Sequence, residues 1–337
     1  MLLVGTCLTG KTLACEILNS PVSSAPAGTV ASIMIGVPSQ GKADIHVHTR
    51  YSGLTTVSFL RFPDSISYPA DVVKMAERRK LDVICVTDHN TIRGALEAKK
   101  AAKEVEVVAG AEIETTDGDV LGLFLMEDVP KKLQAEETID RIHGQGGLAI
   151  APHPFSSHCD ALGRRILDLK LDGVEIFNAA HRDGYTNDAA QIVAGGLHTA
   201  FVGGSDAHAV AMVGNAYTTF DGNSAEDLRR AILAKKTSYA GASTPLKDLV
   251  WMTVNVNIEL WRTLVRSLLG RDVMDGTECP EVVSRMRTIS KVLSIMGATA
   301  FLMPPMPALV GVLGDHIHRR RSRYHFDKVM REANGIA

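Results

Sequence analysis

Histidine and carboxylate side chains recur where predicted strands end, and these residue types are common metal ligands. His46 and His48 alternate on the first predicted strand, so both imidazoles project to the same face. The other members of this set directly follow later strands: Asp88, His89, Glu112, His153, Asp206 and His208. Imidazole and carboxylate together suit zinc, manganese or iron, whereas calcium favours oxygen ligands alone. We therefore expect these residues to bind divalent metal ions.

Seven apolar, β-branched runs alternate with helical patterns in the middle of the chain. The runs cover 43–47, 83–87, 105–109, 120–125, 148–151, 173–177 and 199–202. Apolar residues three and four positions apart predict helices over 70–79, 92–103, 135–143, 185–194 and 225–234. This alternation is typical of a parallel α/β sheet or barrel. Residues beyond the carboxyl ends of barrel strands converge on one mouth, so we expect the candidate ligands to share one rim.

Each candidate ligand alone also has an ordinary structural explanation. Asp88 and Asp206, for example, could cap the segments that follow them. The set as a whole is a stronger signal, and its size predicts two or more ions. A carboxylate that bridges two ions about 3.5 to 4 Å apart is an arrangement used for phosphoester hydrolysis. Metal-dependent hydrolysis is therefore the expected chemistry.

Five short motifs, taken in order, resemble those of the PHP superfamily, named for polymerase and histidinol phosphatase domains. The motifs are DIHVHT at 44–49, TDHN at 87–90, GAEI at 110–113, APHP at 151–154 and GSDAH at 204–208. The resemblance covers about Lys42 to Gly241. It implies a distorted seven-stranded TIM-like β/α barrel with up to three metals and hydrolysis of phosphomonoesters or phosphodiesters.

The resemblance also implies a role for each ligand. His46, His48, Glu112 and Asp206 would hold a first metal, and Glu112 would bridge to a second metal held with His153. His89 and His208 would belong to a third metal. Asp88, next to a ligand, would orient it or join the metal set.

Two positions depart from the family pattern. Gly53 and Leu54 stand where many members have a third-site His or Asp, so a third metal needs another side chain such as Asp64. Asp119 stands where a second-metal His is common, and its carboxylate could serve instead.

The expected mechanism is in-line attack on phosphorus by water that the metals activate. Glu112, Asp206 and His208 are the predicted catalytic residues. Arg50, Arg164 and Arg182 are candidates for phosphate binding because a guanidinium can grip phosphate bidentately. The substrate is expected to be a small phosphorylated molecule, a nucleotide or an oligonucleotide.

Two other functions stay open at this point. An amidohydrolase-like barrel that cleaves C–N or ester bonds also uses an HxH pair and a late Asp, but the strand-end Lys common in that group is not evident. A PHP domain that has lost catalysis could serve as a metal-stabilised scaffold.

Bulk composition gives no sign of export or of a polyanionic partner. The net charge is −2, so no whole-protein field favours nucleic acid. Five widely spread cysteines suit a reducing, cytoplasmic environment. Residues 1–41 are an irregular extension whose P-loop match at Gly5–Thr12 is interpreted as chance, because only Met1 to Val4 precede it.

Residues 243–337, which follow the predicted barrel at 42–242, are expected to form a mainly helical extension. The segment 292–314 holds no charged side chain and precedes a basic run containing Arg319, Arg320, Arg321 and Arg323. Its length could cross a bilayer, but Pro304, Pro305 and Pro307 break it. Membrane contact through 292–323 and a buried or homo-oligomeric interface are equally good expectations.

Overall fold

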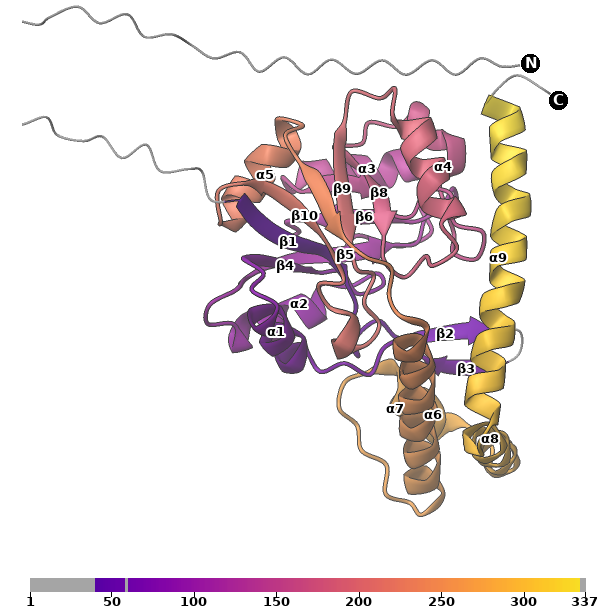
Figure 1. Ribbon diagram of the computed structural model, residues 1–337. Helices are drawn as coiled ribbons and strands as arrows, with labels where there is room; N and C mark the ends of the chain where they lie inside the picture. Colours follow the sequence, from indigo (N-terminus) through magenta and orange to yellow (C-terminus); the bar gives the residue numbers. More distant parts are fainter. Residues whose placement is uncertain (1–39, 58–59, 334–337) are drawn as a thin grey trace, which may run out of the picture. The chain divides into compact units, whose positions relative to one another are not determined.

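The computed structural model describes residues 40–57 and 60–333 (Figure 1). The N-terminal match to the P-loop pattern lies outside the described residues. Nine strands form one sheet in the order β11-β10-β1-β4-β5-β6-β7-β8-β9. Their bounds are β1 Gln40–Val47, β4 Val83–Val86, β5 Glu106–Ile113, β6 Val120–Leu123, β7 Leu148–Ala151, β8 Gly173–Asn178, β9 Ala200–Gly204, β10 Ala216–Asp221 and β11 Ser238–Gly241.

The sheet curls into a nearly closed barrel. The segment directly after β9 returns to β1, where Ala207 pairs with Val47 and the His48 amide donates to the Ala207 carbonyl at 3.0 Å. The seven predicted strands correspond to β1 and β4–β9, so the barrel prediction is confirmed. Strands β10 and β11 add an antiparallel pair beside β1.

Strand β6 departs from the parallel pairing that the alternation of strands and helices favours. This strand runs antiparallel to both β5 and β7. Only residues 114–119 separate β5 from β6, and a parallel neighbour would need a crossover of about a dozen residues or more. The short connection therefore forces a hairpin.

The predicted helices cover the barrel and close one end of it. They are α1 Pro69–Arg78, α2 Arg93–Ala101, α3 Ala135–Gly144, α4 Tyr185–Ala194 and α5 Ala225–Leu233, with short 3-10 turns η1 Gly163–Leu167 and η2 Val210–Met212. Strand β4 is buried on both faces, as expected of a parallel strand: Ile84 packs in the helix-facing core and Cys85 in a second core with Leu228 of α5. A capping box between Ser224 and Asp227 starts α5.

A mainly helical C-terminal region follows, as expected. Its helices are α6 Leu246–Leu268, α7 Glu278–Arg285, α8 Thr288–Leu302 and α9 Met306–Ala333. A small hairpin, β2 Leu54–Val57 with β3 Leu60–Pro63, packs against α6. The long helix α9 (yellow in Figure 1) runs beside α4 and also contacts α6 and α8. The C-terminal helices are thus attached to the barrel itself.

The apolar segment 292–314 is divided between two helices. Helices α8 and α9 meet at an angle of 84° around Pro304 and Pro305. Within the described part of the chain, no single helix has the length and apolarity to cross a membrane, although this bent pair together satisfies both.

Candidate metal centre

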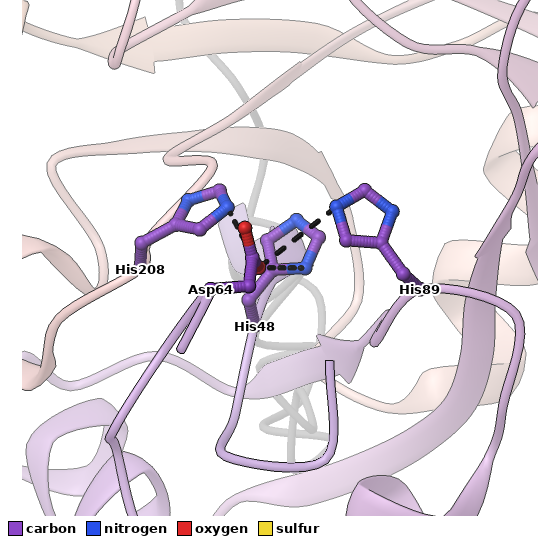
Figure 2. A group of neighbouring side chains, drawn as sticks. All are labelled: His48, Asp64, His89 and His208. Atoms are coloured by element: carbon purple, nitrogen blue, oxygen red, sulfur yellow. Dashed lines mark ion pairs between the residues drawn. The ribbon is translucent and has the colours of Figure 1, made fainter. Parts of the chain in front are cut away.

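Asp64 lies among three histidines that come from distant parts of the sequence. Figure 2 shows its carboxylate between the imidazoles of His48, His89 and His208. The Asp64 Oδ2 atom lies 3.2 Å from His208 Nε2, 3.8 Å from His89 Nε2 and 4.0 Å from His48 Nδ1. Asp64 directly follows the β2–β3 hairpin, which brings it to the mouth of the barrel. The structure therefore supplies the side chain that the positions Gly53 and Leu54 lack.

Glu112, at the end of β5, lies at the centre of the predicted metal ligands. Its Oε2 atom is 3.4 Å from His46 Nε2, from His48 Nε2 and from His89 Nδ1. Its Oε1 atom is 3.0 Å from His153 Nε2. The two oxygens of one carboxylate thus face different imidazoles, which is the arrangement a bridging ligand requires.

Asp206, in the loop after β9, lies beside three of the same histidines. Its Oδ1 atom lies 3.3 Å from His48 Nε2, 3.4 Å from His208 Nδ1 and 3.6 Å from His46 Nε2. Asp206 and His153 both have positive φ angles, +50° and +26°. Such backbone conformations are uncommon for residues with side chains and tend to be found at functional sites.

Glu175 and Asn178 form an outer layer that the sequence reasoning missed. Glu175 Oε1 lies 3.3 Å from His46 Nδ1, and Oε2 accepts from the His153 amide at 2.9 Å. Asn178 Nδ2 donates to Glu175 Oε2 at 2.9 Å and to Asp206 Oδ2 at 3.1 Å. A glutamate inside the apolar strand GVEIFN was the available signal, because buried carboxylates are rare unless paired.

Gly204 leaves room for this outer layer. A Cβ atom at this position would lie 2.7 Å from Glu175 Oε1 and 2.7 Å from the Cβ of His46. The glycine of the GSDAH motif therefore allows β8, β9 and β1 to bring the ligand and its partner together.

Asp88 is turned away from the imidazoles and organises the loop after β1. Its carboxylate accepts from the Thr49 amide at 2.6 Å, the Thr49 hydroxyl at 2.7 Å and the Ser52 hydroxyl at 2.9 Å. Ser52 Oγ in turn lies 2.9 Å from His48 Nδ1. These contacts engage both oxygens of Asp88 with the loop after β1, which suits the orienting role, whereas its role as a metal ligand stays a prediction.

Asp44, the first residue of DIHVH, fixes the loop that carries Asp206. Its buried carboxylate accepts from the Ser205 amide at 2.9 Å, the Ser205 hydroxyl at 2.5 Å and the Gly214 amide at 2.7 Å. Burial raises the pKa of Asp44 to about 6, although these hydrogen bonds oppose the shift.

The buried carboxylates strongly affect protonation of the histidines in the metal-free protein. Burial lowers the pKa of His153, but the Glu112 carboxylate outweighs it and raises the pKa to about 9. Asp64 and Asp206 likewise overcome burial and raise the pKa of His208 to about 10. His48 shows the opposite result: burial and the charge of His208 lower its pKa to about 4. In the metal-free protein, protonated histidines therefore offset part of the negative charge of the carboxylates. Bound cations would offset the same charge.

Several buried polar atoms of the group have no hydrogen-bond partner among the described residues. They are His48 Nε2, Asp64 Oδ2, His89 Nδ1 and Asp119 Oδ1. Asp119 is 5% exposed and lines the same cavity, where burial and the Glu112 charge raise its pKa to about 7. Buried polar atoms are rarely left unpaired. Their types and positions are consistent with metal binding.

The group opens into a cavity of about 1230 Å³ whose wall comes from two parts of the chain. Barrel loops contribute the ligand side, including Glu112, Asp119 and His153. The opposite wall comes from α6 and α9, for example Met252 and Val310. The C-terminal region therefore helps to shape the space in which a substrate would bind.

Basic residues line this cavity, but only one of the three arginines predicted to bind phosphate is among them. Arg182 is part of the wall, whereas Arg50 pairs with Asp275 and stacks on Tyr68 away from it. Arg164 lies on η1 and is also not part of the cavity lining. The basic lining residues are Arg93, Lys131, Lys132, Arg182 and Arg321. Arg50 and Arg164 thus lie outside the cavity lining, and phosphate binding by them stays a prediction.

The comparisons with known proteins agree with the geometry. The PHP domain family matches residues 44–187, and the PHP-associated family matches residues 184–237. The uncharacterized protein MJ1587 of Methanocaldococcus jannaschii is 58% identical over 151 residues, which are 44% of this chain and 88% of that protein. This chain belongs to the PHP family.

This PHP-family chain is also similar to uncharacterized protein MJ1588 of the same organism. It is 33% identical over 118 residues, covering 35% of this chain and all of that protein. The PHP fold also recurs in a crystal structure from Bacteroides vulgatus, described as a two-domain protein containing a predicted PHP-like metal-dependent phosphoesterase. That structure has a TM-score of 0.50 at 18% identity and covers 61% of this chain and 66% of its own, so it supports the fold alone.

Proposed function

We propose that the PHP domain is a metal-dependent phosphoesterase that hydrolyses a phosphomonoester or phosphodiester. The observation that carries this proposal is the position of Glu112, whose two carboxylate oxygens face four imidazoles from the ends of three strands, β1, β4 and β7. A carboxylate between several imidazoles suits a centre of two or three cations.

The chain offers residues for three cations. His46, His48, Asp206 and Glu112 would hold the first, and Glu112, His153 and Asp119 the second. Asp64, His89 and His208 would hold the third. Divalent cations such as Mn²⁺, Zn²⁺ or Fe²⁺ lower the pKa of water and neutralise charge on phosphoryl oxygens when they are bound.

The protein's own residues would position these groups and the substrate. Glu175 orients His46 through Nδ1, and Ser52 orients His48 through Nδ1. Basic side chains on the cavity wall, Arg182 and Arg321 among them, would bind the phosphate and direct it toward Glu112. A small phosphorylated molecule or a nucleotide suits a cavity that helices wall on one side, and a short oligonucleotide is the larger alternative.

The amidohydrolase-like alternative has weaker support. That chemistry often uses a buried lysine that bridges two metals after carbamylation. The cavity is lined by Lys131 and Lys132, but the Lys132 side chain is 56% exposed and pairs with Glu114 at 3.0 Å. Among the described residues, Glu112 pairs with histidines and with no lysine. A non-catalytic scaffold would have no need for a large cavity with basic walls.

Two variants with a matched control test the proposal. The purified protein is assayed for metal content and then for hydrolysis of phosphomonoesters, nucleotides and short oligonucleotides with Mn²⁺ or Zn²⁺. Glu112→Ala and Asp206→Ala should each reduce hydrolysis by about 100-fold or more, because charge stabilisation by metals is worth several kcal/mol. Glu127→Gln, an exposed change outside the cavity, serves as the control. Full hydrolysis by either alanine variant, or none by the wild type on any phosphate ester, would contradict the proposal.

A further inference from the structure

A second group of imidazoles lies where the barrel meets α9. His158 belongs to the loop after β7, His181 to the loop after β8 and His318 to α9. The ring centroids of His158 lie 4.7 Å from His181 and 4.3 Å from His318. One ring nitrogen from each residue lies within 4.8 Å of the others. Three loops or helices far apart in the sequence therefore converge on one point.

His181 is the residue that hydrogen bonding leaves unexplained. It is 1% exposed, and neither ring nitrogen has a hydrogen-bond partner among the described residues. The closest carboxylate atom, Asp183 Oδ2, lies 3.8 Å from His181 Nδ1, which is too long for a hydrogen bond. A fully buried imidazole with two unpaired nitrogens is costly unless something else binds it.

Asp183 adds a carboxylate to the group. Its Oδ2 atom lies 3.3 Å from His318 Nε2, while Oδ1 accepts from the Thr186 amide at the start of α4. The hydrogen bond from Thr186 holds the carboxylate in place. Three imidazoles and one carboxylate are a ligand set that suits zinc and similar first-row cations.

The contacts on either side of His318 hold α9 in register. Asp315 pairs with Arg182 at 3.3 Å, and Ser322 lies 2.9 Å from Ser157 through the two hydroxyls. Positions 315, 318 and 322 are spaced three and four apart, so they share one face of the helix. The contacts of Asp315 and Ser322 therefore hold this face of α9, and His318 with it, against the barrel.

We propose that His158, His181, His318 and Asp183 bind a divalent cation, zinc or a similar first-row metal, at a site separate from the Glu112 centre. This cation would link α9 to the loops after β7 and β8. Because His158 and His318 also line the large cavity, it would hold one wall of that cavity in place. The proposal does not depend on the reaction that the Glu112 centre catalyses.

One competing arrangement uses some of the same residues. His153, Cys159 and His181 also have potential ligand atoms within 4.8 Å of one another. It would place a thiolate on the cation and leave His318 out. The two arrangements therefore predict different ligands, which can be distinguished by spectroscopy.

Metal counting on the full chain is the first test. Wild type, His318→Ala and the control His316→Ala, an exposed histidine on the same helix, are stripped with chelator, reloaded with Zn²⁺ and analysed by mass spectrometry. We expect His318→Ala to bind one equivalent less than the wild type, and His316→Ala to bind the full number. Equal numbers in all three proteins would overturn the proposal. His158→Ala, in an exposed loop, gives the same comparison if His318→Ala does not fold.

Cobalt substitution is the second test because it identifies direct ligands. Loading His318→Cys with Co²⁺ should produce the ultraviolet charge-transfer absorption of a cobalt–thiolate bond, and His316→Cys should not. The wild type should lack that absorption. Its presence in the wild type and its loss in Cys159→Ser would assign the site to His153, Cys159 and His181 and overturn the proposal.

Discussion

Glu175 and His46 come from strands that are not neighbours in the sheet, yet Glu175 Oε1 lies 3.3 Å from His46 Nδ1. Both residues are almost completely buried. The contact fixes the ring so that Nε2 points toward Glu112 and Asp206. Glu175 is therefore a positioning residue, although it touches none of the expected reacting atoms.

Glu175→Gln should weaken metal binding without removing a ligand. Loss of such an outer partner typically costs about 10- to 100-fold in metal affinity. Metal titration by calorimetry should show this loss, and excess metal should restore most of the hydrolysis. The exposed change Glu127→Gln should leave affinity unchanged. Equal affinities for Glu175→Gln and the wild type would mean that the contact does not orient His46.

Asp64→Ala should remove one cation and leave the others. Among the described residues, the Asp64 carboxylate pairs with His48, His89 and His208 alone, whereas Glu112 remains with His46 and His153. We expect the metal-to-protein ratio to fall by about one equivalent, in contrast to a larger loss for Glu112→Ala. An unchanged ratio in Asp64→Ala would show that two cations are the full complement.

Metal binding should release protons, because cations replace protons on the histidines. The pKa values of about 9 for His153 and about 10 for His208 mean that both carry protons at neutral pH in the metal-free protein. Affinity should therefore rise with pH between 7 and 10. Calorimetry in two buffers with different ionisation enthalpies at pH 7.5 measures the protons released, and a count of zero would contradict the expectation.

The same shifts predict how the metal-free protein responds to pH. A histidine whose pKa is raised by folding stabilises the fold fully below its ordinary pKa of about 6.5, and this stabilisation is lost as pH rises through the folded-state value. For His153 and His208 the loss falls between about pH 7 and 10. The melting temperature of the metal-free protein should fall across this range, and added Zn²⁺ or Mn²⁺ should reduce the fall.

Arg321→Ala should raise KM for a phosphorylated substrate and leave metal content unchanged. Arg321 lines the cavity from α9 and makes no ion pair with any carboxylate among the described residues. A lost charge-assisted hydrogen bond at an exposed position is expected to cost about tenfold. Arg50→Ala is the matched control because its guanidinium pairs with Asp275 outside the cavity. Similar KM changes in both variants would argue against a phosphate contact at Arg321.

The apolar face of α8 and the first half of α9 should contact a membrane surface. Its exposed side chains are Ile289, Val292, Leu293, Met296, Met306, Leu309, Val312, Leu313 and Ile317, together with Met303 of the connection between the two helices. The exposed Arg320 and Arg323 follow it, and basic residues beside an apolar helix face favour anionic lipids. We expect the protein to co-sediment with anionic vesicles more than with neutral ones, and a carbonate wash to release it.

Leu313→Ser should reduce this vesicle binding, whereas Leu96→Ser, an exposed leucine on α2, should not. Light scattering provides the other outcome. A dimer that dissociates in Leu313→Ser, with no vesicle binding by the wild type, would assign the face to a homo-oligomeric interface instead.

The barrel could be predicted from sequence because its strands are short, apolar and regularly separated by helices. Strand β6 could not be oriented in this way, because periodicity does not distinguish parallel from antiparallel pairing. Only the length of the loop at 114–119 determined its direction. The hairpin β2–β3 was also not predicted, although it carries Asp64 to the site.

The inner histidines were predictable because each directly follows or ends a strand. Asp64, 16 positions beyond His48, was only a candidate, since a chain folded back by a hairpin has no fixed spacing to its target. His318 was not among the predicted ligands for a similar reason. Its place beside His181 depends on how α9 packs against α4, and contacts between distant elements leave no local pattern.

Because α9 is the last helix in the chain, it is synthesised after all the residues of the Glu112 group. Every residue of the Glu112 group has been synthesised once His208 is added, more than a hundred residues before His318. Domains tend to fold from the N-terminus during synthesis. The barrel can therefore acquire its first cations while one side of the cavity is still open, and the arrival of α9 would then enclose a centre that is already loaded.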